Sequence, residues 1–199
     1  MMDIVCLDLE GVLVPEIWIN VAERTGIEAL RRTTRDEPDY DTLMRSRIEI
    51  LDAHGLRLSD IQAVIAQMGP LEGAREFLDE LRSLTQVLIL SDTFSEFAKP
   101  LMEQLGWPTL FCNSLEVVSD RIVSHRMRIH NGKKAAIEAL HTLNYRTFAA
   151  GDSYNDLAMI RASKAGFLFR STEQIMADNP DLPAYESFDE LLDAFKAAL

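Results

Sequence analysis

Several short apolar runs of this chain are followed by side chains that could do chemistry. These side chains are Asp8 and Glu10, Ser91 and Asp92, and Asp152. Carboxylates brought together from separate segments repel one another unless a cation or a proton lies between them. Oxygen ligands suit Mg²⁺. If the runs converge, we expect Asp8, Glu10 and Asp152 to hold Mg²⁺; the alternative is that they are solvated loop acids.

Two further stretches add cations and an acid-dense turn. Lys133 and Lys134 open a predicted helix, where the helix dipole disfavours cations, so a nearby anion would explain them. Two exposed lysines are the alternative. Asn155 and Asp156 lie near the start of another predicted helix, just after Asp152. Capping accounts for one polar residue at that place, but not for Asp152 as well.

Arg47 is a cation on an apolar helix face. In the helix predicted over 40–54, apolar residues recur on one face, and Arg47 lies on that face four positions after Leu43. A buried guanidinium needs an anionic partner, either a carboxylate or a phosphate. That partner is an internal Glu or a bound anion. Glu16, near the start of an earlier predicted helix, is a candidate for this partner or for binding an ammonium group.

The elements that must position these residues alternate along the chain. Continuous apolar runs predict strands buried on both faces, as in a parallel sheet, at 3–8, 86–91, 146–152 and 165–169. Helical periodicity occurs at 74–84, 94–105, 133–143 and 188–199. This alternation predicts an α/β protein with a doubly wound parallel sheet. Ligands bind beyond the carboxyl ends of such strands, where the reactive side chains fall. Residues 121–129 alternate and predict an antiparallel hairpin attached to the core.

The stretch from 12 to 73 interrupts this rhythm. Its pattern is helical over 15–25, 40–54 and 59–68, with Pro15 at a first helical position and Ser59 as a cap. We therefore predict a small helical bundle inserted after the first strand, over the edge of the sheet where the strands end. The predicted core comprises residues 1–11 and 74–199, and the predicted cap comprises residues 12–73.

Composition limits the classes of partner. The chain has 199 residues, of which 47% are hydrophobic and 26% charged, and its net charge is −12. These values are typical of a globular protein with one core, and the negative charge argues against nucleic acid and anionic membranes as partners. No apolar run approaches the length of a membrane span, and no signal peptide is evident.

The cysteines indicate a compartment. Cys6 and Cys112 each lie in a short apolar run, and no pair of cysteines is spaced to bind zinc. We expect buried, reduced thiols and a cytoplasmic location. The sequence leaves the oligomeric state open, with a homodimer as one option.

The motifs, in this order, resemble those of the haloacid dehalogenase superfamily of phosphotransferases. The matching segments are Asp8 to Gly11 for the first motif, Leu90 to Asp92 for the second, Lys133 for the third, and Gly151 to Leu157 for the fourth. Each motif alone is weak, but four in order along nearly the whole chain are specific. The last motif, with Glu16 and Arg47, is most similar to phosphoserine phosphatases. That resemblance implies a Rossmann-like core with a helical-bundle cap.

Two positions depart from the usual pattern of phosphoserine phosphatases. Glu10 stands where an Asp is usual, and Asp92 where a Gly is common. With the segment from Val14 to Trp18, these features look most like the bifunctional branch that also passes the phosphoryl group to homoserine. The expected partners are therefore small molecules, namely phosphoserine and homoserine.

The resemblance also implies roles. Asp8 would attack phosphorus and form an aspartyl-phosphate, and Glu10 would be the general acid and base. Mg²⁺ would be held by Asp8, Asp152 and the backbone carbonyl of Glu10. The groups that would contact the substrate are Ser91, Asp92, Lys133 and Asn155 at the phosphoryl end, and Glu16 and Arg47 at the amine and the carboxylate. Lys134 also fits the spacing of the third motif, and Asp156 would orient the lysine or assist the metal.

Three alternatives remain open. The chain could be a phosphatase for another small phosphomonoester, in which case a substrate without a carboxylate would leave Arg47 unpaired. It could be a receiver-like phospho-acceptor module, although such a module needs no helical insertion. It could be an acidic interaction protein without catalysis.

Overall fold

The fold is built on one twisted sheet of seven strands, in the order β4-β3-β2-β1-β5-β6-β7. The computed structural model describes residues 1–33, 36–37 and 39–199. The strands are β1 (Met2–Leu7), β2 (Gln86–Phe94), β3 (Thr109–Val118), β4 (Arg121–Arg126), β5 (Tyr145–Gly151), β6 (Ala165–Phe169) and β7 (Ala184–Tyr185). All neighbouring strands run parallel except β3 and β4. The α/β class and the parallel sheet are confirmed.

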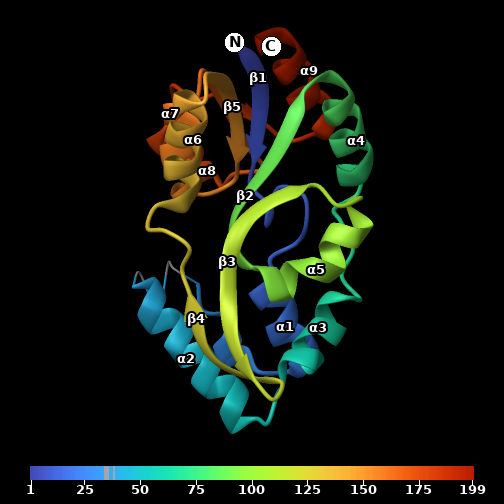
Figure 1. Cartoon of the computed structure of the whole chain (residues 1–199), viewed down its shortest axis with the longest axis vertical. Helices are drawn as coiled ribbons and strands as arrows, with labels where there is room; N and C mark the ends of the chain where they lie inside the picture. The colour runs from blue at the N-terminus through green and yellow to red at the C-terminus, as the bar shows by residue number, and fades with distance from the viewer. Residues whose placement is uncertain (34–35, 38) are drawn as a thin grey trace.

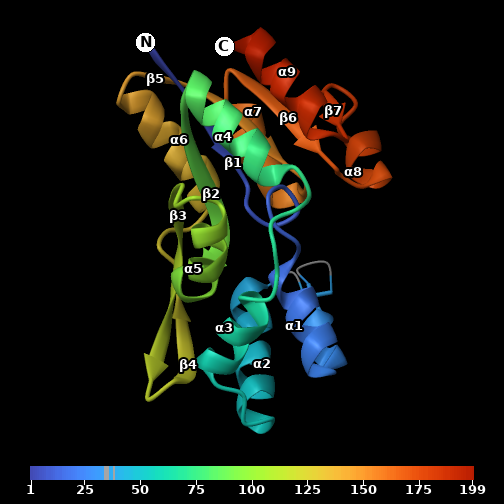
Figure 2. The same cartoon turned by 90° about the vertical axis from the view of Figure 1, so that its right-hand side faces the viewer.

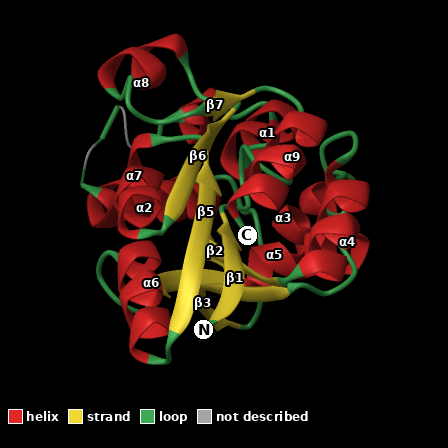
Figure 3. Ribbon diagram, turned by 90° about the horizontal axis from the view of Figure 1, so that it is seen from above, coloured by secondary structure: helices red, strands yellow, loops and turns green. Residues whose placement is uncertain are grey.

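Helices cover both faces of this sheet (Figure 3). They are α4 (Ala74–Leu84), α5 (Ser95–Gln104), α6 (Gly132–Thr142), α7 (Leu157–Ala162), α8 (Glu173–Asp178) and α9 (Phe188–Ala198). The buried side chains of the strands alternate between two apolar clusters. Val5 and Leu7 of β1 join the cluster of α4, α5 and α9, whereas Ile4 and Cys6 join that of α6, α7 and α8. Burial on both faces explains why these strands read as continuous apolar runs.

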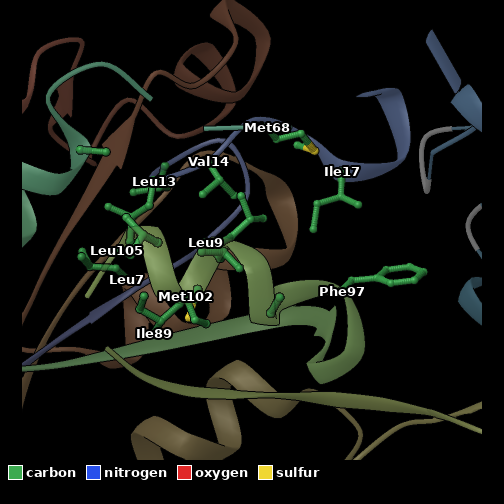
Figure 4. Close-up of a cluster of buried hydrophobic side chains, with 14 of the residues drawn as sticks. Leu7, Leu9, Leu13, Val14, Ile17, Met68, Ile89, Phe97, Met102 and Leu105 are labelled. Atoms are coloured by element: carbon green, nitrogen blue, oxygen red, sulfur yellow. The ribbon is translucent and has the colours of Figure 1, made fainter. Parts of the chain in front are cut away.

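The segment between β1 and α4 extends beyond the carboxyl ends of the strands (Figures 1 and 2). Its elements are α1 (Ile17–Thr25), the 3₁₀ turn η1 (Glu28–Arg31), α2 (Tyr40–Ala53) and α3 (Leu58–Ile65). Its apolar side chains are continuous with the core: Leu13, Ile17 and Met68 belong to the same cluster as Ile89 and Met102 (Figure 4). The segment therefore packs directly against the edge of the sheet and is not merely connected to it by a flexible linker.

The β3–β4 hairpin reaches the same end of the molecule and lies beside α2 (Figure 1). At its tip, the carbonyl oxygen of Asp120 accepts from Leu58 N at 2.9 Å. The carboxylate of Asp120 accepts from Ser59 N at 3.1 Å and from Ser59 Oγ at 2.6 Å. The hairpin thus caps the start of α3.

Several sequence expectations need correction. Pro15 is not the first helical residue, because α1 begins at Ile17 with Glu16 at the N-cap. Ser59 does not cap its helix: α3 begins at Leu58, and Asp120 supplies the acceptor from elsewhere in the fold. The alternating stretch from 121 forms one strand of an antiparallel hairpin, as predicted, but the strand ends at Arg126.

Strands β3 and β7 and helix α8 were not predicted, whereas α7 is the helix expected after the turn at 151–157. The two cysteines are free, as expected, but only Cys6 is fully buried, and Cys112 is half-buried. In the described part of the chain, no helix is both long enough and apolar enough to span a membrane.

Candidate active site

Three parallel strands deliver reactive side chains to one cavity. Asp8 follows β1, the central strand of the sheet, Ser91 lies in β2, and Asp152 follows β5. Strands β2 and β5 flank β1 on its two sides. These side chains line a cavity of about 210 Å³ together with residues of α1 and α2. The predicted convergence is therefore present, and it places the cavity at the carboxyl edge of the sheet, between the sheet and the inserted helices.

The loop after β1 is held tightly against this edge. Leu9 N donates to Asp8 Oδ1 at 2.7 Å, which fixes the carboxylate against its own backbone. Gly11 has φ of 78°, and a Cβ there would lie 2.5 Å from Asp152 Cγ. Gly11 is therefore required twice, once for the left-handed backbone and once for the approach of Asp152.

Lys133 joins two of the acids. It is 5% exposed, and its Nζ lies 2.9 Å from Asp8 Oδ1 and 2.6 Å from Asp156 Oδ1. Burial opposes its charged form, but Asp156 and Asp8 outweigh burial and raise the pKa of Lys133. Lys134 points elsewhere, half-exposed and 3.4 Å from Glu138. Of the two lysines that fit the motif spacing, the structure brings Lys133 to Asp8.

Asp156 is fully buried and organises the turn after β5. Its Oδ2 accepts from Asp152 N at 3.2 Å and from Ser153 N at 3.1 Å, while Oδ1 binds Lys133. A Cβ on Gly151 would lie 2.3 Å from Asp156 Cγ, so the turn closes only around a glycine. Asp156 thus orients both the lysine and the loop that carries Asp152.

The acids of the cavity suit a divalent cation. One carboxylate oxygen from each of Asp8, Asp152 and Asp156 lies within 4.8 Å of the others. Burial, and then the negative charge of Asp156, raise the pKa of Asp8 well above its ordinary value. The same two causes raise the pKa of Asp152 to about 7. A single lysine leaves negative charge unbalanced here, and hard oxygen ligands of this kind fit Mg²⁺.

Glu10 turns away from that cluster, so the predicted metal role does not extend to its carboxylate in this arrangement. Its Oε2 accepts from Ile17 N at 2.8 Å, at the start of α1. Burial, and then the charge of Glu16, raise the pKa of Glu10 to about 7. A carboxyl group with such a pKa can give or take a proton near neutral pH.

The second motif forms another part of the cavity wall. Ser91 Oγ accepts from Thr93 N at 3.2 Å, which leaves its hydroxyl proton to donate into the cavity. Asp92 is half-buried, and its Oδ2 accepts from Asn155 Nδ2 at 3.0 Å. The predicted residues Asp92 and Asn155 therefore lie together and bind each other. Tyr40 of α2 also donates to the carbonyl of Asp92, at 3.2 Å.

Arg47 and Glu16 line the end of the cavity that the inserted helices form. Arg47 is 6% exposed, and it forms no ion pair with any residue that the structure describes. Its Nε is buried without a hydrogen-bond partner there. Glu16 is exposed at the N-cap of α1 and does not pair with Arg47. The described residues therefore give Arg47 no ion pair with an internal Glu, and the bound anion stays a prediction.

Trp18, Tyr40 and Thr93 are among the lining residues that the sequence analysis did not single out. Trp18 and Tyr40 read as members of apolar helix faces, and nothing local distinguishes a face that meets a cavity from one that meets a core. Thr93 had a usable signal, because it lies two positions after Ser91 and side chains two apart on a strand share a face.

Comparison with known proteins agrees with this geometry. Residues 2–164 match the family model described as haloacid dehalogenase-like hydrolase. The chain is 55% identical over 198 residues to phosphoserine phosphatase ThrH of Pseudomonas aeruginosa, covering 99% of this chain and 97% of that protein. It is 56% identical over 194 residues to a phosphoserine phosphatase of Pseudomonas syringae, covering 97% of this chain and 82% of that one.

Solved structures share the fold. An apo phosphoserine phosphatase superposes with a TM-score of 0.80 at 21% identity, covering 97% of this chain and 98% of the other. A substrate-bound phosphoserine phosphatase gives a TM-score of 0.79 at 20% identity, with 98% of each chain covered. Family model, relatives and fold agree with the four motifs, and the chain belongs to the haloacid dehalogenase-like hydrolases.

Proposed function

We propose that this protein is a Mg²⁺-dependent phosphoserine phosphatase that acts through an aspartyl-phosphate on Asp8 and also transfers the phosphoryl group to homoserine. The observation that carries the proposal is a single cavity with two chemically different ends. One end holds Asp8, Ser91, Lys133 and Asp152, and the other holds Arg47 and Glu16. The names of the two Pseudomonas relatives support the same substrate.

In the first step, an oxygen of Asp8 attacks phosphorus, and the bond from phosphorus to the serine oxygen breaks. Glu10 gives its proton to that departing oxygen, so serine leaves as the neutral alcohol. Lys133 and the hydroxyl of Ser91 bind the phosphoryl oxygens, where negative charge spreads in the transition state. Asp156 keeps the lysine in place through the 2.6 Å ion pair.

In the second step, Glu10 takes a proton from the incoming nucleophile. The oxygen of water or of the homoserine hydroxyl bonds to phosphorus, and the bond to Asp8 breaks, which restores the carboxylate. Water yields inorganic phosphate and homoserine yields its phosphate ester. Only an acceptor held in place can compete with water, which is present at roughly 55 M, so transfer depends on the cavity binding homoserine.

Asp8, Asp152 and the backbone carbonyl of Glu10 would hold Mg²⁺. When bound, the ion neutralises charge between the nucleophile and the phosphoryl oxygens. The repulsion among the described carboxylates supports this assignment, because the cluster needs a cation beyond Lys133.

Residues 12–73 act as a cap in this proposal, and residues 1–11 and 74–199 act as the catalytic core. Arg47 binds the substrate carboxylate and Glu16 its ammonium group, while Asp92 and Asn155 border the phosphoryl end. Homoserine carries the same amine and carboxylate, so the same pair serves donor and acceptor in turn. Cys6, a free buried thiol, is compatible with the cytoplasmic location that we propose.

The direct test is to incubate the protein with L-phosphoserine and Mg²⁺, with and without homoserine, and to identify products by ³¹P NMR. We expect inorganic phosphate alone without homoserine, and an added phosphohomoserine signal with it. Asp8→Asn, which keeps the shape but removes the attacking charge, should lower turnover by orders of magnitude. Inorganic phosphate as the sole product at saturating homoserine would remove the transferase half.

Arg47→Ala separates phosphoserine from other phosphomonoesters. Loss of a charge-assisted carboxylate pair should lower kcat/KM for phosphoserine ~30- to 1000-fold. Phosphoethanolamine, which lacks the carboxylate, should be affected much less. An equal loss for both substrates would mean that Arg47 supports the cap and does not read the carboxylate.

A further inference from the structure

We propose that Trp18 is a positioning residue that holds the Arg47 guanidinium in the orientation needed to bind the substrate carboxylate. This inference rests on the proposed function and deepens it. It adds to the arginine a specificity determinant that carries no charge and so cannot form an ion pair with the substrate.

The two side chains stack inside the inserted segment. The Cζ atom of Arg47 lies 4.5 Å from the centre of the Trp18 ring system, within the range of a cation–π contact. Trp18 comes from α1 and Arg47 from α2, so the contact joins two helices of the segment. Both residues line the cavity, yet only 8% of Trp18 and 6% of Arg47 is exposed. Water therefore screens this contact little.

The remaining contacts of Arg47 do not fix the plane of its guanidinium group. One terminal nitrogen donates to Arg32 O at 2.7 Å, and the other approaches Met44 Sδ at 3.7 Å. The buried Nε is without a partner among the described residues. A single strong hydrogen bond still allows the planar group to rotate about that bond. Stacking on Trp18 removes this freedom, because the ring fixes the plane.

The ring itself is held from the core. Trp18 meets the edge of Phe97 with centroids 5.4 Å apart and planes at 73°, and Phe97 meets Phe94 at 5.7 Å and 89°. Phe94 is the last residue of β2, three positions after Ser91. Phe97 extends from α5 on the side of the apolar cluster where Ile17 lies (Figure 4). Through these aromatic contacts, the position of the Trp18 ring, and with it the orientation of Arg47, is tied to the strand that carries Ser91.

Arg47 is buried without an ion-pairing carboxylate among the described residues, so its charge is not neutralised by a direct partner. Desolvation lowers the pKa of Arg47 to about 10, in spite of the negative charges of Glu10 and Glu16. The aromatic face stabilises the cation without occupying its donors. The N–H groups that do not bind Arg32 O or contact Met44 Sδ therefore stay available for a carboxylate, whereas an internal acid in place of Trp18 would have occupied them.

The experiment compares Trp18→Leu with Trp107→Leu, the same change at the other tryptophan, which is 60% exposed. For each variant, kcat and KM are measured with phosphoserine and with phosphoethanolamine. Loss of the stacking should lower kcat/KM for phosphoserine roughly 3- to 30-fold, mainly through KM. Phosphoethanolamine should change by less than about 2-fold, and Trp107→Leu should change neither substrate.

Two further variants show whether a loss of selectivity in Trp18→Leu comes from misfolding, and whether it acts through Arg47. Trp18→Phe keeps an aromatic face and should restore most of the selectivity if Trp18→Leu is unstable. In the background of Arg47→Ala, Trp18→Leu should no longer alter the ratio of the two substrates, because residues that act through one interaction are not additive.

Fluorescence gives a second readout that does not require turnover. With Trp107→Phe, Trp18 is the sole tryptophan, and L-serine or homoserine should shift its emission, whereas ethanolamine should not. With Trp18→Phe, the emission of Trp107 should respond to neither.

The outcomes separate the two proposals. Wild-type protein that does not hydrolyse phosphoserine overturns the proposed function and this inference together. If the wild type is active, three results overturn the inference alone. Trp18→Leu could lower kcat/KM equally for both substrates, or for neither. Trp18→Leu could also change the ratio of the two substrates as strongly in the Arg47→Ala background as in the wild type.

Discussion

Gly11 shows how one residue couples backbone conformation to the acid cluster. Gly11→Ala should lower the free energy of unfolding by at least about 1 kcal/mol, because Ala is strained at a positive φ. It should also displace Asp152, whose Cγ lies 2.5 Å from the position of the new Cβ, and so lower Mg²⁺-dependent turnover. Thermal unfolding and steady-state kinetics measure the two effects.

Gly26→Ala is the matched control. Gly26 has φ of 71°, close to that of Gly11, but nothing lies within 4 Å of its Cβ position. It should show the loss of stability with normal turnover. If both variants keep normal turnover, Asp152 does not need the space that Gly11 leaves.

Lys133 and Lys134 offer a comparison between adjacent residues. Lys133→Met removes the buried cation between Asp8 and Asp156, so turnover should fall on the order of 100- to 1000-fold. The pKa of Asp8 should rise further, because Lys133 now lowers it. Lys134→Met breaks only an exposed pair with Glu138 and should change turnover and stability little. Equal losses in the two variants would contradict the assignment of Lys133.

At the scale of elements, the tip of the hairpin is the main tie between the β3–β4 extension and α3. Asp120→Gly removes the carboxylate that binds Ser59 but keeps a residue that tolerates the observed φ of 67°. We expect the free energy of unfolding to fall by about 1 kcal/mol and hydrogen exchange at the Ser59 amide to accelerate.

Ser119→Gly makes the same change at the preceding left-handed position, where φ is 49°. Ser119→Gly has the same backbone entropy cost as Asp120→Gly, but it keeps the Asp120 carboxylate that binds Ser59. The difference between the two variants therefore measures the cap, and equal stabilities would show that the hairpin does not support α3.

Elements whose patterns are local were predictable from the sequence. The runs at β1, β2, β5 and β6 are apolar because both of their faces are buried. Three of the four motifs lie at or near the ends of β1, β2 and β5, and the third, Lys133, lies at the start of α6. Strand β3 was not predicted, because its environment changes along its length. It pairs with β2 in parallel up to Asn113 and then with β4 in antiparallel fashion from Ser114, so its burial changes along its length.

Contacts between residues far apart in the sequence could not be predicted from local patterns either. The cap on α3 comes from Asp120, and the acceptor for Tyr40 comes from Asp92, each far along the chain from its partner. Motif spacing identifies which residues bear chemistry, but not that the carboxylate of Glu10 turns toward Ile17.

At the scale of the whole molecule, the net charge of −12 attracts any cation diffusely, so stabilisation by Mg²⁺ does not by itself reveal a site. NaCl at equal ionic strength reproduces the diffuse effect. Glu103→Gln, an exposed change in α5, alters the net charge by the same amount as Asp152→Asn. It therefore controls for charge outside the cluster.

Asp152→Asn distinguishes site binding from this diffuse attraction. Without Mg²⁺, the variant should be more stable than wild type by about 1 kcal/mol, because one of three mutually repelling carboxylates is gone. With Mg²⁺ at roughly 100 times its Kd, wild type should gain about 2.7 kcal/mol and the variant almost nothing beyond the NaCl effect. The order of stabilities thus reverses when the ion is added, while Glu103→Gln follows wild type throughout. Denaturant unfolding in EDTA, in Mg²⁺ and in matched NaCl measures all three proteins, and parallel gains in wild type and Asp152→Asn would show that Asp152 does not hold the ion.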